Sequence, residues 1–311
     1  MSRTKFAASV VPTQMITAAD GNTYAYRRQG IGGVPLVLFN RFRGMLDDWD
    51  PYLLDLLSAD REVIVFDNAG VGRSGGGFPD TIDEAARNAI GVVEALGLDL
   101  VDLMGFSMGS YVVQSFTVQR PELVRRIILT GSGAESRASS WTTAVTEAAL
   151  RDHDDPADTV FLFFEPTTSS TGAGWAYQER IKDRETDLDI PVTAETRTQQ
   201  LKAMKAWAGS SELVAKKLRS ISVPALIANG DNDIMIGTDN TVDLGNLIPF
   251  SQTEIYPDAG HGFLFQYPEL FSKHVNDFLT HEYVLPERDI HEWADAFISE
   301  THERKISHGN P

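Results

Sequence analysis

The residues of this sequence best suited to chemistry lie in the pentapeptide Gly-Phe-Ser-Met-Gly at positions 105–109. The apolar run at 100–104 predicts a buried strand before it, and residues 108–119 predict a helix after it. A serine on such a sharp turn projects its hydroxyl out of the sheet, and its neighbours must be small because backbone segments approach closely there. The pattern therefore predicts that Ser107 is a nucleophile, with a structural glycine-rich turn as the alternative.

A serine nucleophile needs a base, and among the seven histidines His261 has the most suitable position. It stands between two glycines in YPDAGHGFLF, directly after a predicted strand at 252–256. A residue at the carboxyl edge of an open α/β sheet can point into the crevice where such sheets bind ligands. We therefore expect His261 to be the general base. The other histidines lie in a charged loop, a helix and the polar C-terminal tail (His153, His274, His281, His291, His302 and His308).

The histidine in turn needs a carboxylate that fixes its tautomer and stabilises the imidazolium. Asp231 and Asp233 both follow the predicted strand at 224–228. Either carboxylate could reach His261 from this sheet edge, while the other caps the turn. The sequence thus predicts a triad of Ser107, one of these two aspartates and His261.

Eight predicted strands would position these groups. They are expected at residues 13–17, 23–28, 35–39, 62–66, 100–104, 126–130, 224–228 and 252–256. The later strands are short, continuous apolar runs, which is typical of a parallel sheet buried on both faces. Helices are expected between the strands, for example after the capping pattern of Thr81 and Glu84. This alternation predicts an α/β fold with an eight-stranded, mostly parallel sheet flanked by helices.

The alternation stops between residues 134 and 220, where helix-like segments appear without a convincing strand. We therefore expect an α/β core of residues 1–133 and 221–285, interrupted by a helical cap at 134–220. Residues 286–311 are expected to form a C-terminal helical extension. Its apolar face comprises Ile290, Trp293, Ala294 and Phe297. Either the cap or this extension could join two copies in a homodimer.

The composition limits the partners. A net charge of −17 disfavours nucleic acid and anionic membrane surfaces, because both attract basic proteins. The chain has no apolar run of about 18 residues, and its N-terminus does not resemble a signal peptide. It also has no cysteine, so we expect a cytoplasmic protein whose partner is a small-molecule substrate.

No metal or cofactor is expected. The stretch at 70–75 spells Gly-x-Gly-x-x-Gly after a predicted strand. A dinucleotide site requires that turn to open directly into a helix, with an acid at the end of the next strand. Here further glycines and Phe78-Pro79 follow instead, so we interpret this stretch as a turn.

The order Ser107, aspartate, His261 and the pentapeptide together resemble the α/β-hydrolase superfamily, over roughly residues 15–282. The resemblance implies that Asp233, three residues after Gly230, is the acid. It also implies an oxyanion hole formed by the amides of Met108 and Phe42. The loop after residues 35–39 departs from the family, because Asn40 and Arg41 stand where relatives often have His-Gly.

The resemblance implies a serine hydrolase that cleaves an ester or lactone of a small, largely apolar molecule beneath the helical cap. Candidate substrate-binding residues are Arg41, Phe106, Trp141, Phe164, Trp175, Trp207 and Phe263. Arg41 or Arg43 could bind a substrate carboxylate, although pairing with Asp47, Asp48 or Asp50 is the preferred interpretation. Alternatives with the same triad are a carbon–carbon bond hydrolase, a thioesterase and a cofactor-free peroxidase. A non-catalytic small-molecule receptor is an alternative of another class.

Overall fold

The structure is a computed structural model that describes residues 6–134, 142–151, 155–208 and 211–281. Its eight-stranded sheet has the order β1-β2-β4-β3-β5-β6-β7-β8. The strands are β1 (Gln14–Thr17), β2 (Thr23–Gln29), β3 (Leu36–Phe39), β4 (Val63–Phe66), β5 (Val101–Phe106), β6 (Val124–Thr130), β7 (Ala225–Gly230) and β8 (Ser251–Tyr256). All pairs from β4 to β8 are parallel, whereas β2 is antiparallel to both β1 and β4. The predicted fold class and all eight strands are confirmed, with small differences at the strand ends.

The central strands are buried because both faces of the sheet carry helices. Every residue of β3, β4, β5 and β7 is buried. Successive side chains of a strand point to opposite faces. Accordingly, Val37 and Phe39 belong to one apolar cluster, and Leu36 and Leu38 belong to the other. The continuous apolar runs of the sequence thus reflect two separate cores, one on each side of the sheet.

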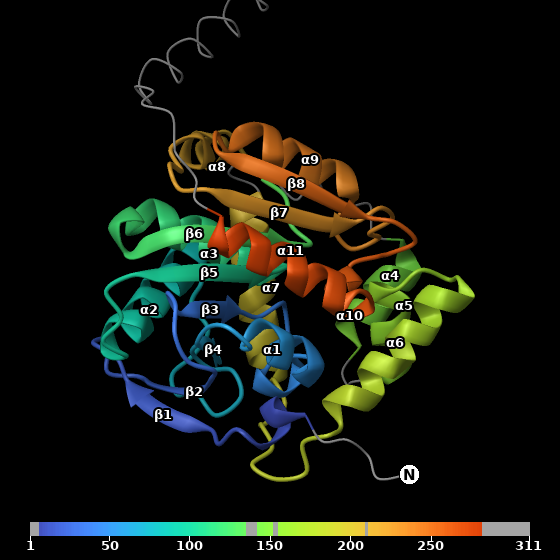
Figure 1. The fold of residues 1–311 in the computed structure, drawn as a ribbon, viewed down its shortest axis with the longest axis horizontal. Helices are drawn as coiled ribbons and strands as arrows, with labels where there is room; N and C mark the ends of the chain where they lie inside the picture. Colours follow the sequence, from blue (N-terminus) through green and yellow to red (C-terminus); the bar gives the residue numbers. More distant parts are fainter. Residues whose placement is uncertain (1–5, 135–141, 152–154, 209–210, 282–311) are drawn as a thin grey trace, which may run out of the picture.

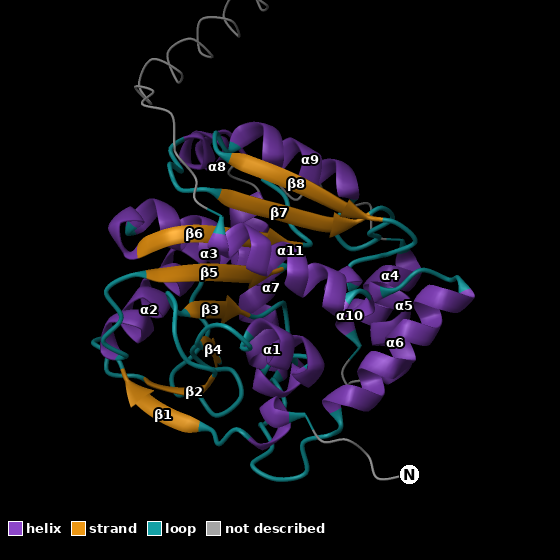
Figure 2. Cartoon of the chain, viewed as in Figure 1, coloured by secondary structure: helices purple, strands orange, loops and turns teal. Residues whose placement is uncertain are grey.

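One face is covered by α2 (Ile82–Ala95), α3 (Met108–Gln119), α8 (Ser211–Arg219) and α9 (Thr238–Leu247), and the other by α1 (Pro51–Leu57) and α11 (Pro268–Thr280). Figure 2 shows the strands following one another from β1 at the lower edge to β8 at the upper edge, with helices on both sides. Helix α2 begins where the capping pattern predicts, because the Thr81 side chain accepts a hydrogen bond from the Glu84 amide. No helix within the described ranges combines the length and the apolar character needed to cross a membrane.

The chain between β6 and β7 forms helices. They are α4 (Thr143–Leu150), α5 (Pro156–Phe163), α6 (Thr168–Ile181), α7 (Ala194–Ala208) and α8. In Figure 1, α4, α5 and α6 lie beyond the ends to which the arrows of β7 and β8 point. Helix α7 contacts α2, and α8 contacts α3 and α9, so these two helices pack on the sheet layer. The expected extension at 286–311 lies outside the described residues.

The described part of the chain also contains three short 3₁₀-helical segments. They are η1 (Ala7–Val10), η2 (Leu46–Asp48) and η3 (Pro121–Leu123). A further short helix, α10 (Phe263–Gln266), follows His261 and leads into α11. Segments η2 and α10 both flank loops at the carboxyl edge of the sheet, where the predicted catalytic side chains lie.

Candidate active site

Ser107 occupies a strained turn between β5 and α3. Its φ is 55° and its ψ is −120°, a region that residues with a side chain rarely adopt. The two glycines of the pentapeptide make this turn possible. A Cβ on Gly105 would lie 2.4 Å from the Ser110 Cα, and a Cβ on Gly109 would lie 2.1 Å from the Phe39 carbonyl oxygen. Neither position has room for alanine, so the spacing of the two glycines follows from the geometry of the turn.

His261 and Asp233 are in direct contact. The Nδ1 atom of His261 lies 2.6 Å from Oδ2 of Asp233. The other carboxylate oxygen, Oδ1, accepts hydrogen bonds from the amides of Met235 and Ile236 at 2.7 and 2.9 Å. Both side chains are buried. The carboxylate is thereby fixed by the loop after β7, and it directs the remaining ring nitrogen of His261 away from Asp233.

Asp231 has a different role. Its carboxylate accepts hydrogen bonds from the amides of Asp258 and Ala259, each at 3.1 Å. These bonds join the loop after β7 to the loop after β8. The sequence pattern alone did not distinguish the two aspartates, and the structure gives them different partners. Asp233 holds the histidine, and Asp231 holds the segment that carries it.

Two phenylalanines enclose the imidazole. The ring of Phe106 lies 4.9 Å from the ring of His261, and the ring of Phe163 packs edge-on at 5.2 Å. Phe106 precedes the nucleophile and was expected near the site. Phe163 ends α5 and belongs to the run of aromatic residues in the insertion. Its contact with His261 was missed, because the sequence does not indicate which of these neighbouring rings turns inward.

Ser107 and His261 line the same cavity, which has a volume of about 220 Å³. Its apolar lining comes largely from the insertion: Ala148, Ala149, Pro156, Leu162, Phe163 and Ile181, with Met235 from the loop after β7. Its polar lining comprises Arg41, Arg43, Asp48, Asp155, Asp158, Thr159 and Gln178. The cavity lies between the sheet edge and α4, α5 and α6. A ligand inside it would face both apolar and charged groups.

The loop after β3 leaves one amide without an acceptor. The amides of Arg41, Arg43, Gly44, Met45 and Leu46 all donate hydrogen bonds within the protein. Within the described residues the Phe42 amide has none, and Phe42 lines the cavity. On the opposite side, Met108 is the first residue of α3, where the opening amides of a helix lack intrahelical acceptors. This hydrogen bonding is compatible with the prediction that the amides of Phe42 and Met108 bind the oxyanion.

The two arginines of this loop connect it to its surroundings. Arg41 forms an ion pair with Asp48 at 3.1 Å and donates to the Phe42 carbonyl at 2.9 Å. Its guanidinium also lies 5.2 Å from the ring centre of Phe163. Arg43 donates to the carbonyls of Ala149 and Arg151, at the end of α4. The preferred interpretation of Arg41, pairing with a nearby acid, agrees with this geometry.

Among the described residues, the other expected substrate-binding aromatic side chains do not line the cavity. Phe164 is buried against Tyr177, and Phe263 is buried between Tyr256 and Phe271. Trp207 packs on Tyr111, while Trp175 is 45% exposed. Trp141 lies outside the described residues. Helices turn only some of their large side chains toward any one neighbour, and in this insertion most of them face the protein body or solvent.

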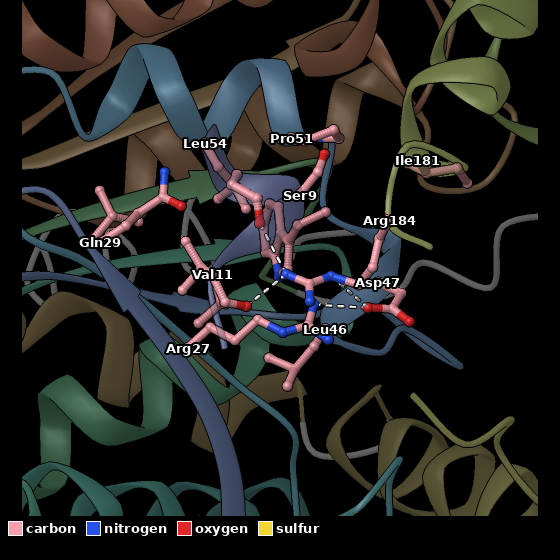
Figure 3. A pocket seen from close by; sticks show the side chains of 14 residues that line it. Ser9, Val11, Arg27, Gln29, Leu46, Asp47, Pro51, Leu54, Ile181 and Arg184 are labelled. Carbon is pink, nitrogen blue, oxygen red and sulfur yellow. Dashed lines mark hydrogen bonds and ion pairs between the residues drawn. The ribbon is translucent and has the colours of Figure 1, made fainter. Parts of the chain in front are cut away.

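A second, smaller cavity of about 20 Å³ lies on the other side of η2. Figure 3 shows Arg27 and Arg184 directed at Asp47 there, and Arg184 also donates to the carbonyls of Ala8 and Val11. The volume is close to that of a single water molecule. This region holds the N-terminal segment in place and has no room for a substrate.

Comparisons with known proteins agree with this architecture. Residues 34–268 match the family described as alpha/beta hydrolase fold. An alpha/beta hydrolase fold protein from Chitinophaga pinensis has a TM-score of 0.79 and 33% identity, covering 88% of this chain and 99% of its own. A 2-hydroxymuconate semialdehyde hydrolase from Pseudomonas sp. (strain CF600) is 24% identical, covering 80% of this chain and 87% of its own. An enol-lactonase from Burkholderia xenovorans LB400 has a TM-score of 0.69 at 20% identity, covering 86% of this chain and 100% of its own. The sheet order and the strained turn at Ser107 agree with this match, and the chain belongs to the alpha/beta hydrolase fold family.

Proposed function

We propose that the protein is a serine hydrolase that cleaves an ester or lactone bond of a small molecule through an acyl-enzyme. The observation that carries this proposal is the contact of His261 with Asp233, on the wall of the cavity that also exposes Ser107. A buried carboxylate that holds one ring nitrogen leaves the other nitrogen to act as a base. Serine, histidine and aspartate in this arrangement serve acyl transfer on several unrelated folds.

In the first half-reaction, the Ser107 hydroxyl attacks the substrate carbonyl carbon while His261 accepts its proton. Asp233 stabilises the imidazolium that forms. The carbonyl oxygen becomes negatively charged and is bound by the amides of Phe42 and Met108. Donors fixed in advance stabilise such charge more effectively than water, because they need no reorganisation during the reaction.

The tetrahedral intermediate then collapses, and His261 returns the proton to the leaving alcohol. The acyl group remains bonded to Ser107. In the second half-reaction, His261 removes a proton from water, which attacks the acyl carbon and restores the serine. A lactone follows the same steps, except that the alcohol and the acid end on one product molecule.

The cavity lining supports a substrate with two parts. Apolar side chains of α4, α5 and α6 suit a hydrocarbon portion, since burial of apolar area favours binding. Arg41, Arg43, Asp155 and Asp158 line the same cavity, and these groups favour a second portion that forms hydrogen bonds. We therefore propose an ester or lactone of moderate size that is apolar at one end and polar at the other.

A carbon–carbon bond hydrolase is the second candidate. It is favoured by the similarity to the 2-hydroxymuconate semialdehyde hydrolase of Pseudomonas. Such a reaction would use the same triad, so the two candidate functions are distinguished by the substrates that the protein cleaves. A panel that contains esters, thioesters, lactones and vinylogous 1,5-diketones would distinguish them by the ratio of their kcat/KM values.

The class of activity is tested with a fluorophosphonate probe, which labels activated serines. We expect the wild-type protein to be labelled and to hydrolyse at least one ester or lactone of the panel. Ser107→Ala should lose labelling and lower kcat by about 10³-fold or more, and Asp233→Asn should lower kcat by a similar order. Folded wild-type protein that is neither labelled nor active would contradict the proposal and favour a small-molecule receptor.

A further inference from the structure

We propose that Gln200 is a positioning residue of this active site, which holds the loop after β3 so that the Phe42 amide faces the oxyanion. Gln200 lies in α7, in the insertion, and is fully buried. Its Oε1 atom accepts the amide of Arg43 at 3.0 Å, across a separation of 157 residues. The inference rests on the proposed function, because only an acyl-transfer reaction forms the oxyanion.

Arg43 needs an external support for its backbone. Its φ is 61°, in the left-handed region that residues with a side chain seldom adopt. Such a conformation persists only where the surroundings fix it. The bond from the Arg43 amide to Gln200 supplies one such contact, and it lies one residue after Phe42. A contact from α7 thus holds the loop at Arg43, the residue that follows the proposed donor Phe42.

Asn40 fixes the near side of the same donor. Its Oδ1 atom accepts the Arg41 amide at 2.9 Å, and its Nδ2 atom donates to the Met45 carbonyl at 2.5 Å. The backbone of Gly44 packs directly on this side chain, because a Cβ there would lie 2.2 Å from Oδ1. With the amides of Arg41 and Arg43 both engaged, Phe42 is the residue between them whose amide can turn to the cavity.

The nitrogen of the Gln200 side-chain carboxamide indicates why a glutamine stands at this position. Its Nε2 atom is buried and has no hydrogen-bond partner among the described residues. A buried donor without an acceptor is unfavourable, so an apolar residue would suit the packing better. The residue is explained by Oε1, whose partner is the loop that carries the proposed oxyanion donor.

The test compares three variants with the wild-type protein. Gln200→Met keeps the shape and removes the acceptor, and Gln200→Glu keeps an acceptor oxygen. Gln199→Met makes the same change one residue earlier in α7, on a partly exposed side chain. For each we would measure kcat, KM, thermal unfolding, and inhibition by a trifluoromethyl ketone, whose hemiketal with serine mimics the oxyanion.

We expect Gln200→Met to lower kcat by about 10-fold to 100-fold, as a displaced catalytic group does, with KM within about 2-fold of wild type. Affinity for the ketone should fall in parallel, while Gln200→Glu and Gln199→Met stay within about 3-fold of wild type. Because a smaller folded fraction lowers kcat without weakening the affinity of the folded enzyme for the ketone, reduced stability alone would not produce this parallel loss. Unchanged kcat in Gln200→Met, or equal losses in Gln200→Glu or Gln199→Met, would overturn the role of Gln200. If Ser107→Ala hydrolyses as fast as wild type, the proposed function itself fails.

Discussion

Ser107, Gly105 and Gly109 show how one turn determines the residue types at three positions. A serine at φ 55° stores backbone strain of about 1–3 kcal/mol. The surrounding contacts must offset this strain, and they do so by packing α3 directly against β3 and β5. Gly109 touches the Phe39 carbonyl, and Gly105 touches the backbone of Ser110. The backbone conformation of Ser107 therefore depends on close backbone packing.

The first prediction at this scale concerns Gly109→Ala. The new Cβ would meet the Phe39 carbonyl at 2.1 Å, so helix α3 must shift, and we expect the free energy of unfolding to fall by about 3 kcal/mol. Gly172→Ala is the matched control, because Gly172 lies within α6 and a Cβ there meets nothing within 4 Å. That change should raise the free energy of unfolding by about 0.5–1 kcal/mol, since alanine favours helix. Denaturant titration of both variants measures the difference, and equal effects would contradict the packing argument.

At the scale of elements, two acids join β4 to the segment between α6 and α7. Asp67 follows β4, and the amide of Leu46 lies 2.9 Å from Asp67 Oδ1 and 3.2 Å from Asp189 Oδ2. Both carboxyl groups lie close to Gly72, where a Cβ would be 2.3 Å from Asp67 Oδ2 and 2.4 Å from Asp189 Oδ1. Burial raises the pKa of Asp67 well above its ordinary value, and the neighbouring Asp189 raises it further. Asp67 therefore keeps its proton in the folded protein at pH values where an exposed carboxyl has lost it.

This pair predicts a loss of stability with rising pH. The folded chain holds the Asp67 proton more tightly than the unfolded chain, so its contribution is complete below about pH 4 and is lost as the pH rises through the folded-state pKa. Within that window the loss is about 1.4 kcal/mol per pH unit. Asp67→Asn keeps a neutral side chain and should gain stability relative to wild type as the pH rises from about 4 to about 8. Urea denaturation across this pH range tests the direction of this change in stability, with the exposed Asp99→Asn as control. A constant difference between Asp67→Asn and wild type would argue against a raised pKa of Asp67 in the folded protein.

A buried ion pair joins α1 to α6. Asp50 caps α1 and is fully buried, and its carboxylate accepts three hydrogen bonds from the Arg180 guanidinium. Burial raises the pKa of Asp50, and Arg180 opposes that shift. The pair holds α6 of the insertion against α1, the helix that follows β3 and η2.

Removing one member of this pair should destabilise the protein more than removing both. Arg180→Met leaves a buried charge without its partner and should lower the free energy of unfolding by about 3 kcal/mol. Asp50→Asn in the same chain removes the charge but keeps the helix cap, and should restore more than half of that loss. A double-mutant cycle gives the coupling energy. Additive effects would mean that the pair does not couple the two helices.

At the scale of the whole molecule, the sequence predicts the sheet well and the cavity poorly. Strands such as 35–39 and 62–66 are recognisable because their burial on both faces requires continuous apolar residues, which is a local property of the chain. Ser107, Asp233 and His261 are recognisable for a related reason, since each stands beside a strand end. The insertion at 134–220 is recognisable by the missing strand pattern, and its described part contains helices and loops without a strand.

The cavity wall depends on contacts between distant segments, which no local pattern encodes. Aromatic residues of the insertion suggested a substrate surface, yet Trp175 is exposed and Trp207 packs on the body. Phe163 touches His261, although its neighbour Phe164 carries the same side chain. Gln200 had no signal at all, because a buried glutamine in a helix has no motif and its partner lies 157 residues earlier.

The contacts of Arg184 have a consequence for how the chain is made. Arg184 binds the carbonyls of Ala8 and Val11 and approaches Asp47, so segments separated by 176 residues meet there. A nascent chain leaving the ribosome cannot complete the native surroundings of Ala8 until Arg184 has also emerged, although domains generally fold in order of synthesis. The N-terminal segment therefore cannot form all of its native contacts until most of the insertion has been translated. A shortened chain without that insertion would lose these contacts of its N-terminal segment, and the hydrogen bonds from Ala7 and Ala8 to Asp55 of α1 would remain.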